Sequence, residues 1–356
     1  MRKTLIWIGL LLITLVIRQV LHQQPALTEQ WYTKGIFVGV RWFLDTLNAG
    51  LPIPAFYLVL ALLLFFLGKG IRHWYVSGDS RWKKAQQSGL RLVAFLCGLV
   101  VFFYWFWGFN YSRMSIEAQM DIPAVVLNDT TLRQMLDEQS QLVDSLRLTL
   151  QPDTAAMIDQ FTPADSLETA VRGALSQYLT AAGIHAPGNP RGREPFWNGF
   201  LLRFGAAGVY NPFTGECNID RGLPNLTKPY TLAHEFCHGY GFADEGTCNF
   251  LAYLALSASP DVHLRYAGEL AFWREMAGAY SRAQPEAYKL IWQNRPGGFQ
   301  KDILHIRATI NQYPEFFEAF RVKAYDHYLK AQGIEEGIKN YGKVIALVAG
   351  YRGRKK

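Results

Sequence analysis

The sequence predicts a mainly α-helical fold, with three transmembrane helices at the N-terminus and a mostly helical domain with a small β element after them. Half of the 356 residues are hydrophobic and only 18% are charged, below the roughly 25% of an average globular protein. The apolar residues gather in three N-terminal stretches, and an ordinary globular composition follows Asn110. We therefore expect a membrane domain over 1–110 and a second domain over 111–356.

Three apolar stretches, at about 5–21, 51–68 and 92–108, are candidate membrane spans. Each has about 17–18 residues, near the lower limit for crossing roughly 30 Å of hydrocarbon at 1.5 Å per residue. The bulky, polar segment 18–24 is unlike a signal-peptide cleavage site, so the first stretch is expected to be an uncleaved anchor. The segment 31–47 mixes aromatic, aliphatic and charged residues and is expected to lie in the membrane surface.

Lysine and arginine predict the orientation. Arg2, Lys3 and six further cations in the loop 69–91 lie on one side of the membrane, whereas the loop 23–50 holds two. By the positive-inside rule the first group is cytoplasmic, which places the residues after Asn110 outside the cytoplasm. We expect a multi-pass protein of the bacterial inner membrane with a periplasmic domain. The net charge is +7, and the basic residues concentrate at the ends of apolar stretches and at the C-terminus. The expected partner is therefore the lipid bilayer and not nucleic acid.

The second domain is expected to be mostly helical, with a small β element just before residue 229. Helical periodicity and charge placement predict helices over about 130–150 and 163–182, the latter with a capping-box variant at 162–165. Short apolar runs at 200–204 and 208–210, in a Gly- and Pro-rich region, are expected to form short strands and loops. From Pro229 onward nearly everything is expected to be helical.

A metal-binding pattern follows Pro229, in the run His234-Glu235-Phe236-Cys237-His238. Histidines four apart on a helix project from one face and can bind one zinc ion. Glu235 is turned by about 100° from His234 and can reach a zinc-bound water without being a ligand. The alternative is a surface helix with two histidines and no metal. The pattern predicts a Zn²⁺ site with Glu235 as the general base.

The third ligand is open, because a catalytic zinc site needs one more protein ligand and two acids follow the glycine turn at Gly241. The run from His234 to Asp244 resembles the metzincin pattern, with Asp in place of the final histidine. Glu245 instead begins a segment that resembles the E-x-x-A-D/N element of gluzincin membrane peptidases. In that group the Glu binds zinc and the residue four later, here Asn249, orients a ligand histidine.

Further segments resemble a family of bacterial membrane proteins that is catalogued only as a domain of unknown function and regarded as zinc peptidases. These segments are 107–111, 208–216, 249–254 and 325–330, and the resemblance covers nearly the whole chain. In the family the acid at the position of Glu245 is regular, whereas that at Asp244 varies. The chain departs from the pattern with Thr247 and Cys248, where members usually carry Glu and Ala. The resemblance implies a zincin-like metallopeptidase domain with Glu245 as third ligand.

A possible substrate-binding strand precedes the motif. Tyr210, Asn211 and Phe213 could belong to an edge strand along which a peptide binds, as in gluzincins. Pro212 and Gly215 could equally make a simple turn.

Other candidate residues have weaker signals. His327 and Tyr341, in the C-terminal helical region, could donate to the oxyanion of a tetrahedral intermediate. The alternative, which we favour for each, is a structural role. Cys217, Cys237 and Cys248 lie near the motif and could be ligands or buried thiols, with one left over from any pairing.

The sequence therefore predicts a membrane-anchored zinc metallopeptidase that hydrolyses envelope or membrane-proximal proteins or peptides. The alternative is a non-catalytic zinc-containing membrane sensor or assembly factor, which would need the histidines but not Glu235. Nothing in the sequence identifies a cleavage specificity or an oligomeric state.

Overall fold

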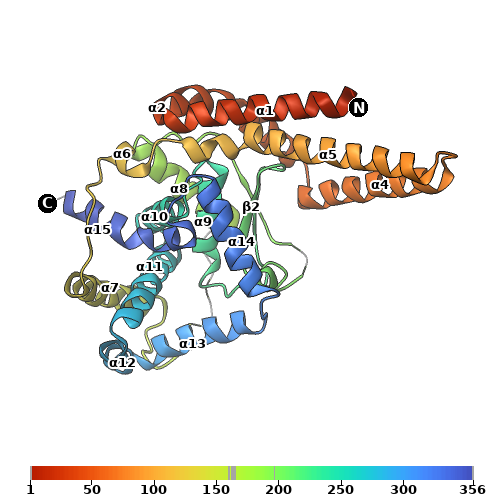
Figure 1. Ribbon diagram of the computed structural model, residues 1–356. Coiled ribbons are helices and arrows are strands. Elements are labelled where there is room, and N and C mark those ends of the chain that lie inside the picture. The colour runs from red at the N-terminus through yellow and green to blue at the C-terminus, as the bar shows by residue number, and fades with distance from the viewer. Residues whose placement is uncertain (1, 159–160, 162–165, 196, 355–356) are drawn as a thin grey trace. The chain divides into compact units, whose positions relative to one another are not determined.

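The structure is a computed structural model that describes residues 2–158, 161, 166–195 and 197–354 (Figure 1). Its contacts divide the chain into two compact units. Unit 1 comprises Met1–Met114 and Asn211–Glu216, and unit 2 comprises Ser115–Tyr210 and Cys217–Lys356. The predicted boundary lies near residue 110, whereas the first unit ends at Met114 and also includes a short later segment. The mainly helical fold with a small sheet is confirmed.

Unit 1 is built from helices. They are α1 (Arg2–Gln23), α2 (Pro25–Leu27), the π-helix η1 (Thr28–Ile36), α3 (Phe37–Ala49), α4 (Ala55–Val76), α5 (Arg81–Phe106) and the 3₁₀ helix η2 (Gly108–Ser112). Helices α1, α4 and α5 are long and apolar enough to cross a membrane, with 22, 22 and 26 residues. They extend beyond the predicted stretches, and at 1.5 Å per residue each spans more than the roughly 30 Å of hydrocarbon.

The segment expected at the membrane surface forms η1 and α3. Its polar side chains are partly buried within unit 1, and Arg41 is fully so. Arg41 pairs with Asp45 on the same helix and donates from Nη1 to the carbonyl of Gly215 (3.0 Å). Asn48 donates to the carbonyl of Thr214 (2.7 Å). These contacts explain why residues 211–216 belong to unit 1; a location in the membrane surface stays a prediction.

Glu216 stabilises the start of a candidate membrane helix. Its side chain is fully buried, and its two carboxylate oxygens accept the backbone N–H groups of Ala55 (2.9 Å) and Phe56 (3.2 Å) at the beginning of α4. A helix N-terminus leaves such N–H groups without partners in the helix and favours negative charge. The carboxylate is therefore compensated although it is buried.

Unit 2 contains the remaining helices and the sheet. Its helices are α6 (Ile116–Met120), α7 (Asp129–Leu150), α8 (Leu167–Ala181), η3 (Leu202–Phe204), α9 (Lys228–Gly239), α10 (Glu245–Ser257), α11 (Val262–Ala283), α12 (Pro285–Gln293), α13 (Gly297–Asn311), α14 (Glu318–Ala331), η4 (Gly337–Lys343) and α15 (Val344–Arg354). The strands are β1 (Arg191–Arg193), β2 (Gly208–Asn211) and β3 (Glu216–Ile219), in the order β1-β3-β2. Strand β2 is thus at an edge. The capping box expected at 162–165 lies outside the described residues.

Of the two apolar runs expected to form short strands and loops, 208–210 lies in strand β2, whereas 200–204 contains no strand. Residues 202–204 form the 3₁₀ helix η3 because the buried carboxylate of Asp220 accepts the N–H groups of Gly199 (2.7 Å), Leu201 (2.7 Å) and Leu202 (3.2 Å). Three N–H groups that converge on one side chain cannot also alternate between neighbouring strands. A distant acid therefore overrides the local apolar pattern.

Helices α9 and α10 lie in the core of unit 2. Almost every residue of α10 from Glu245 to Leu256 is buried, as is the second half of α9. Helix α10 is apolar on most of its circumference, which is typical of a buried helix. Helix α11 packs against α10 and α7, where Trp273 donates its indole N–H to the Ser140 hydroxyl (2.8 Å). The motif helix is therefore held by a packed surround.

A buried ion pair provides a test of this packing. Arg147 on α7 donates from Nε to Asp302 on α13 (2.8 Å), with the two side chains 2% and 0% exposed. Replacing Asp302 by Ala leaves a buried guanidinium without its partner, which should lower the free energy of unfolding by about 3–5 kcal/mol. Thermal and denaturant unfolding in detergent measure it. The matched control is Asp137→Ala, because the Arg133–Asp137 pair on α7 is about half exposed and should be worth less than about 1 kcal/mol. Equal losses in the two variants would contradict the prediction.

Candidate metal centre

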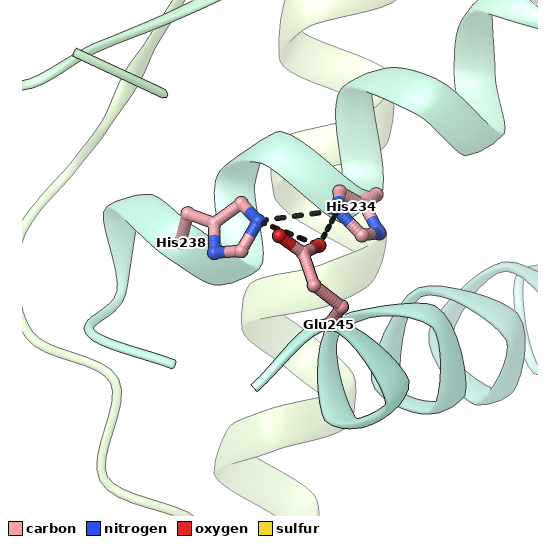
Figure 2. A group of neighbouring side chains, drawn as sticks. All are labelled: His234, His238 and Glu245. Carbon is pink, nitrogen blue, oxygen red and sulfur yellow. Dashed lines mark hydrogen bonds and ion pairs between the residues drawn. The ribbon is translucent and has the colours of Figure 1, made fainter. Parts of the chain in front are cut away.

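The two motif histidines lie on α9, and a tight turn returns the chain to α10. Pro229 stands in the first turn of α9. The predicted turn at Gly241 is present, with φ of +87°, a conformation that glycine adopts readily. The N–H of Phe242 donates to the carbonyl of Cys237 (3.0 Å) across this turn. Glu245 is then the first residue of α10, so the turn brings its side chain back toward α9 (Figure 2).

Three side-chain atoms converge in the buried space between these helices (Figure 2). His234 Nε2 lies 3.0 Å and His238 Nε2 lies 3.3 Å from Glu245 Oε2, and the two nitrogens are 3.1 Å apart. Ligands about 2.0–2.1 Å from a tetrahedral metal ion lie roughly 3.3–3.4 Å from one another. The group could therefore hold a metal ion with little movement. Two imidazoles and a carboxylate suit several transition metals, so the ligand set alone is not specific to zinc.

The far side of each imidazole fixes which nitrogen faces the group. His234 Nδ1 donates to Asn249 Oδ1 (2.7 Å), and His238 Nδ1 donates to the carbonyl of Phe242 (2.8 Å). Both oxygens can only accept, so Nδ1 carries the proton in each ring. In a neutral imidazole the lone pair is then on Nε2, which is directed at Glu245. Asn249 therefore fixes the orientation of the His234 ring.

Asp244 has a different task. One of its oxygens accepts from the backbone N–H and from the hydroxyl of Thr247 (both 2.7 Å), and the other accepts from Asn340 (2.9 Å). It is the N-cap of α10, a position for which Asp is well suited. Of the two adjacent acids, the structure brings Glu245 into the group of three and leaves Asp244 as a cap.

Glu235 is buried next to the histidines but is not one of the three grouped residues. Its carboxylate accepts the backbone N–H of Tyr210 on β2. Burial raises the pKa of Glu235, the nearby imidazoles oppose that rise, and the charge of Glu245 adds to it. Gly208 also contacts it, because a Cβ at Gly208 would lie 2.6 Å from Glu235 Oε1. The edge strand therefore holds the carboxylate in place.

The charges of the group depend on one another. Burial alone would lower the pKa of His238, but the Glu245 carboxylate outweighs it and raises that pKa to about 9. Burial would likewise raise the pKa of Glu245, yet the two imidazoles hold it well below its usual value. Without an ion the group is thus a proton-sharing cluster. A metal ion binds neutral imidazole, so it would replace that proton.

Tyr325, on α14, is a member of the site that the sequence did not predict. Its hydroxyl donates to Glu245 Oε1 (2.6 Å). In the same segment, His327 is exposed and its Nδ1 donates to the carbonyl of Lys323 within the same helix (2.7 Å). A role of His327 as oxyanion donor stays a prediction. The side chain of Tyr341 lies outside the described part of the chain.

All four cysteines are free and buried. Cys217 donates to the carbonyl of Glu235 (3.1 Å). The sulfur of Cys248 lies 3.4 Å from His238 Nδ1, on the face away from Glu245, and it also contacts the thiol of Cys237. Burial raises the pKa of Cys248 well above its usual value. The three thiols near the site are therefore buried around it and are not among the three grouped donors.

The two interpretations of residues 210–215 are both found. Tyr210 and Asn211 end the edge strand β2. The following residues make a turn, in which the Asn211 carbonyl accepts the N–H of Gly215 (2.7 Å) and its side chain accepts the N–H of Phe213 (3.0 Å). Tyr210 belongs to unit 2, whereas Asn211 and Phe213 belong to unit 1. Binding of a substrate along the strand stays a prediction.

The fold and site define a mainly helical protein with three candidate membrane spans and a buried group that could hold a metal ion. The chain belongs to the family described as "Protein of unknown function (DUF3810)", which matches residues 32–349. No curated protein matches it, and no solved structure does. The predicted membership of an uncharacterised family is therefore confirmed. An activity can be proposed only from the residues of the site.

The two adjacent acids allow a direct test of the ligand set. Glu245→Gln removes the carboxylate of the group, whereas Asp244→Asn removes the other carboxylate and retains a good helix cap. We expect Glu245→Gln to weaken zinc binding by more than the roughly 10–100-fold that loss of an outer partner costs. Asp244→Asn should leave it within a few-fold. Competition with a chromophoric chelator measures both, and the reverse order would exclude Glu245 as a ligand.

Proposed function

We propose that the chain is a zinc-dependent metallopeptidase of the bacterial inner membrane, which hydrolyses peptide bonds of envelope or membrane-proximal proteins from the periplasmic side. The observation that carries the proposal is the position of Glu235. It is a buried carboxylate beside a three-donor group to which it does not belong, on the same helix as the two histidines. A purely structural zinc site would have no use for it.

The ligand set supports a catalytic rather than a structural ion. Structural zinc sites are closed by four protein ligands, whereas catalytic ones keep three and leave a position for water. Among the described residues, only His234, His238 and Glu245 form a group that could hold a metal ion, and together they offer three donors. When bound, a zinc ion would lower the pKa of water and polarise the scissile carbonyl.

The chain's own residues would supply the proton transfers. Glu235 takes a proton from the attacking water on its carboxylate and passes it to the nitrogen of the leaving amine. Its contact with the Tyr210 N–H and the absence of a side chain at Gly208 fix where that carboxylate lies. Asn249 and the Phe242 carbonyl keep both imidazoles in the tautomer that can bind a metal.

The membrane address supports the class of substrate. Three helices are long and apolar enough to anchor the chain, and the distribution of lysine and arginine favours a periplasmic site. A tethered active site meets membrane and envelope proteins at a higher effective concentration than soluble ones.

Glu235→Gln tests the proposal. The variant keeps the size of the side chain but cannot take a proton, so hydrolysis should fall by at least about 10²–10⁴-fold while zinc remains bound. Mass spectrometry of new protein N-termini in cells that produce each form measures cleavage, and metal analysis of the purified chain measures zinc. The exposed Glu138→Gln is the control. Identical sets of N-termini for wild type and Glu235→Gln would instead support a non-catalytic zinc brace.

Gly208→Ala tests the positioning of the base separately. The new Cβ would lie 2.6–2.9 Å from atoms of the Glu235 carboxyl group, so that group must move. A displacement of about 1 Å can cost on the order of 10²-fold in rate, and we expect a loss of this size with zinc binding unchanged. Gly173→Ala on α8 meets no atom within 4 Å and serves as control. Full activity of Gly208→Ala would mean that β2 does not position Glu235.

A further inference from the structure

Six aromatic residues form an exposed surface on unit 2, away from the residues of the metal group in sequence. We call it the aromatic surface; it consists of Trp197, Phe200, Phe204, Phe316, Phe317 and Phe320. Five of them are strongly exposed. Their exposed fractions are 66% for Trp197, 51% for Phe204, 44% for Phe316, 80% for Phe317 and 75% for Phe320. Soluble proteins rarely expose so many large apolar groups together, so such a patch marks an interaction site.

The aromatic surface is ordered, because contacts join the two segments that supply it. Neighbouring rings pack in a row, with centroids 5.8 Å apart for Trp197 and Phe200, 5.5 Å for Phe200 and Phe204, and 6.0 Å for Phe204 and Phe316. The N–H of Phe316 donates to the carbonyl of Arg203 (2.7 Å), and the Arg203 guanidinium lies over the Phe316 ring. Four of the six rings are thus joined by contacts, and Phe317 and Phe320 follow Phe316 closely in the same segment.

The backbone of Phe317 has an energetically unfavourable conformation. Its φ is +58°, in the left-handed region that is a genuine outlier for a bulky residue. Strain of this kind persists where the surrounding structure requires it and is often connected with function. Here the strained residue is the N-cap of α14 and points an 80% exposed ring outward.

We infer that the aromatic surface inserts into the interfacial region of a lipid bilayer. Insertion of tryptophan and phenylalanine rings to that depth, at the headgroup boundary, is favourable in free energy. A bilayer is expected beside this chain, because three of its helices are long and apolar enough to span one. The inference therefore rests on the spans and not on the proposed peptidase activity.

A lipid surface also fits these residues better than a peptide does. A peptide side chain is recognised in a concave pocket, whereas these rings protrude, with exposed fractions of up to 80%. Lipid adapts its shape to protruding rings. The nearby charges are mixed, with Glu315 and Glu318 beside Arg321 and Lys323. Insertion should therefore occur in zwitterionic as well as anionic bilayers.

Site-directed spin labels on the full-length chain test the inference. The four native cysteines are buried, so a nitroxide reagent will label an introduced exposed cysteine. The test positions are Trp197→Cys, Phe317→Cys and Phe320→Cys, and the controls in unit 2 are Leu290→Cys on α12 and Leu304→Cys on α13, which are 63% and 53% exposed. The protein is reconstituted in phosphatidylcholine vesicles, and collision rates of the label with oxygen and with a polar nickel complex are compared.

Insertion into lipid concentrates oxygen and excludes the nickel complex around the label. We expect the ratio of oxygen to nickel collisions to be several-fold higher at all three test positions than at the two controls. A ratio equal to that of the controls would overturn the inference, because the rings would then face water. Low collision rates with both reagents would also overturn it, since they would show a protein partner or a second copy over the surface. The variant Phe320→Ser, with the label at 317, should lower the ratio if the rings insert together.

Discussion

The site depends on the close approach of three electron-pair donors in a buried space. The Nε2 atoms of His234 and His238 lie 3.1 Å apart, and Glu245 Oε2 lies within 3.3 Å of both. Two imidazole lone pairs at this distance repel each other unless a proton or a cation lies between them. Without an ion the pKa of His238 is raised to about 9, because the Glu245 carboxylate, with Glu235 and the Phe242 carbonyl, outweighs the burial that disfavours the proton. A metal ion satisfies all three donors at once, with both imidazoles neutral.

The neighbouring residues divide the work that this approach requires. Asp244 and Glu245 are adjacent acids with separate tasks, because Asp244 is the extended N-cap of α10 whereas Glu245 is its first helical residue. Asp244 closes the first turn of α10 by accepting from Thr247, and Glu245 points toward α9. Four residues later, on the same face as Glu245, Asn249 accepts from His234. One short turn and one helix start therefore place both Glu245 and the partner that orients His234.

The parts that the sequence predicts are those set by local spacing. Periodicity and apolar length predict the three long helices, and the i, i+4 rule predicts that His234 faces His238 and that Asn249 shares a face with Glu245. Residues 200–204 do not form a strand, because Asp220, about twenty residues away, accepts N–H groups at this segment. Tyr325 could not be chosen over His327, because the face of α14 that meets Glu245 depends on contacts between residues eighty positions apart. Long-range partners, not local pattern, decide these points.

Helix α14 joins the two unusual features of unit 2. Leu329 is its one buried residue among those described, so packing alone holds it weakly. Two polar contacts supplement that packing: the N–H of Phe316 on the Arg203 carbonyl before its first turn, and the Tyr325 hydroxyl on Glu245. A hydrogen bond to a carboxylate is worth about 1.5–3 kcal/mol, which is large for a helix so little buried. Phe317 and Tyr325 are eight residues apart, or about 12 Å along the helix axis. The exposed rings and the contact to Glu245 are therefore carried by one continuous segment, with the rings where α14 begins and the contact about two turns later.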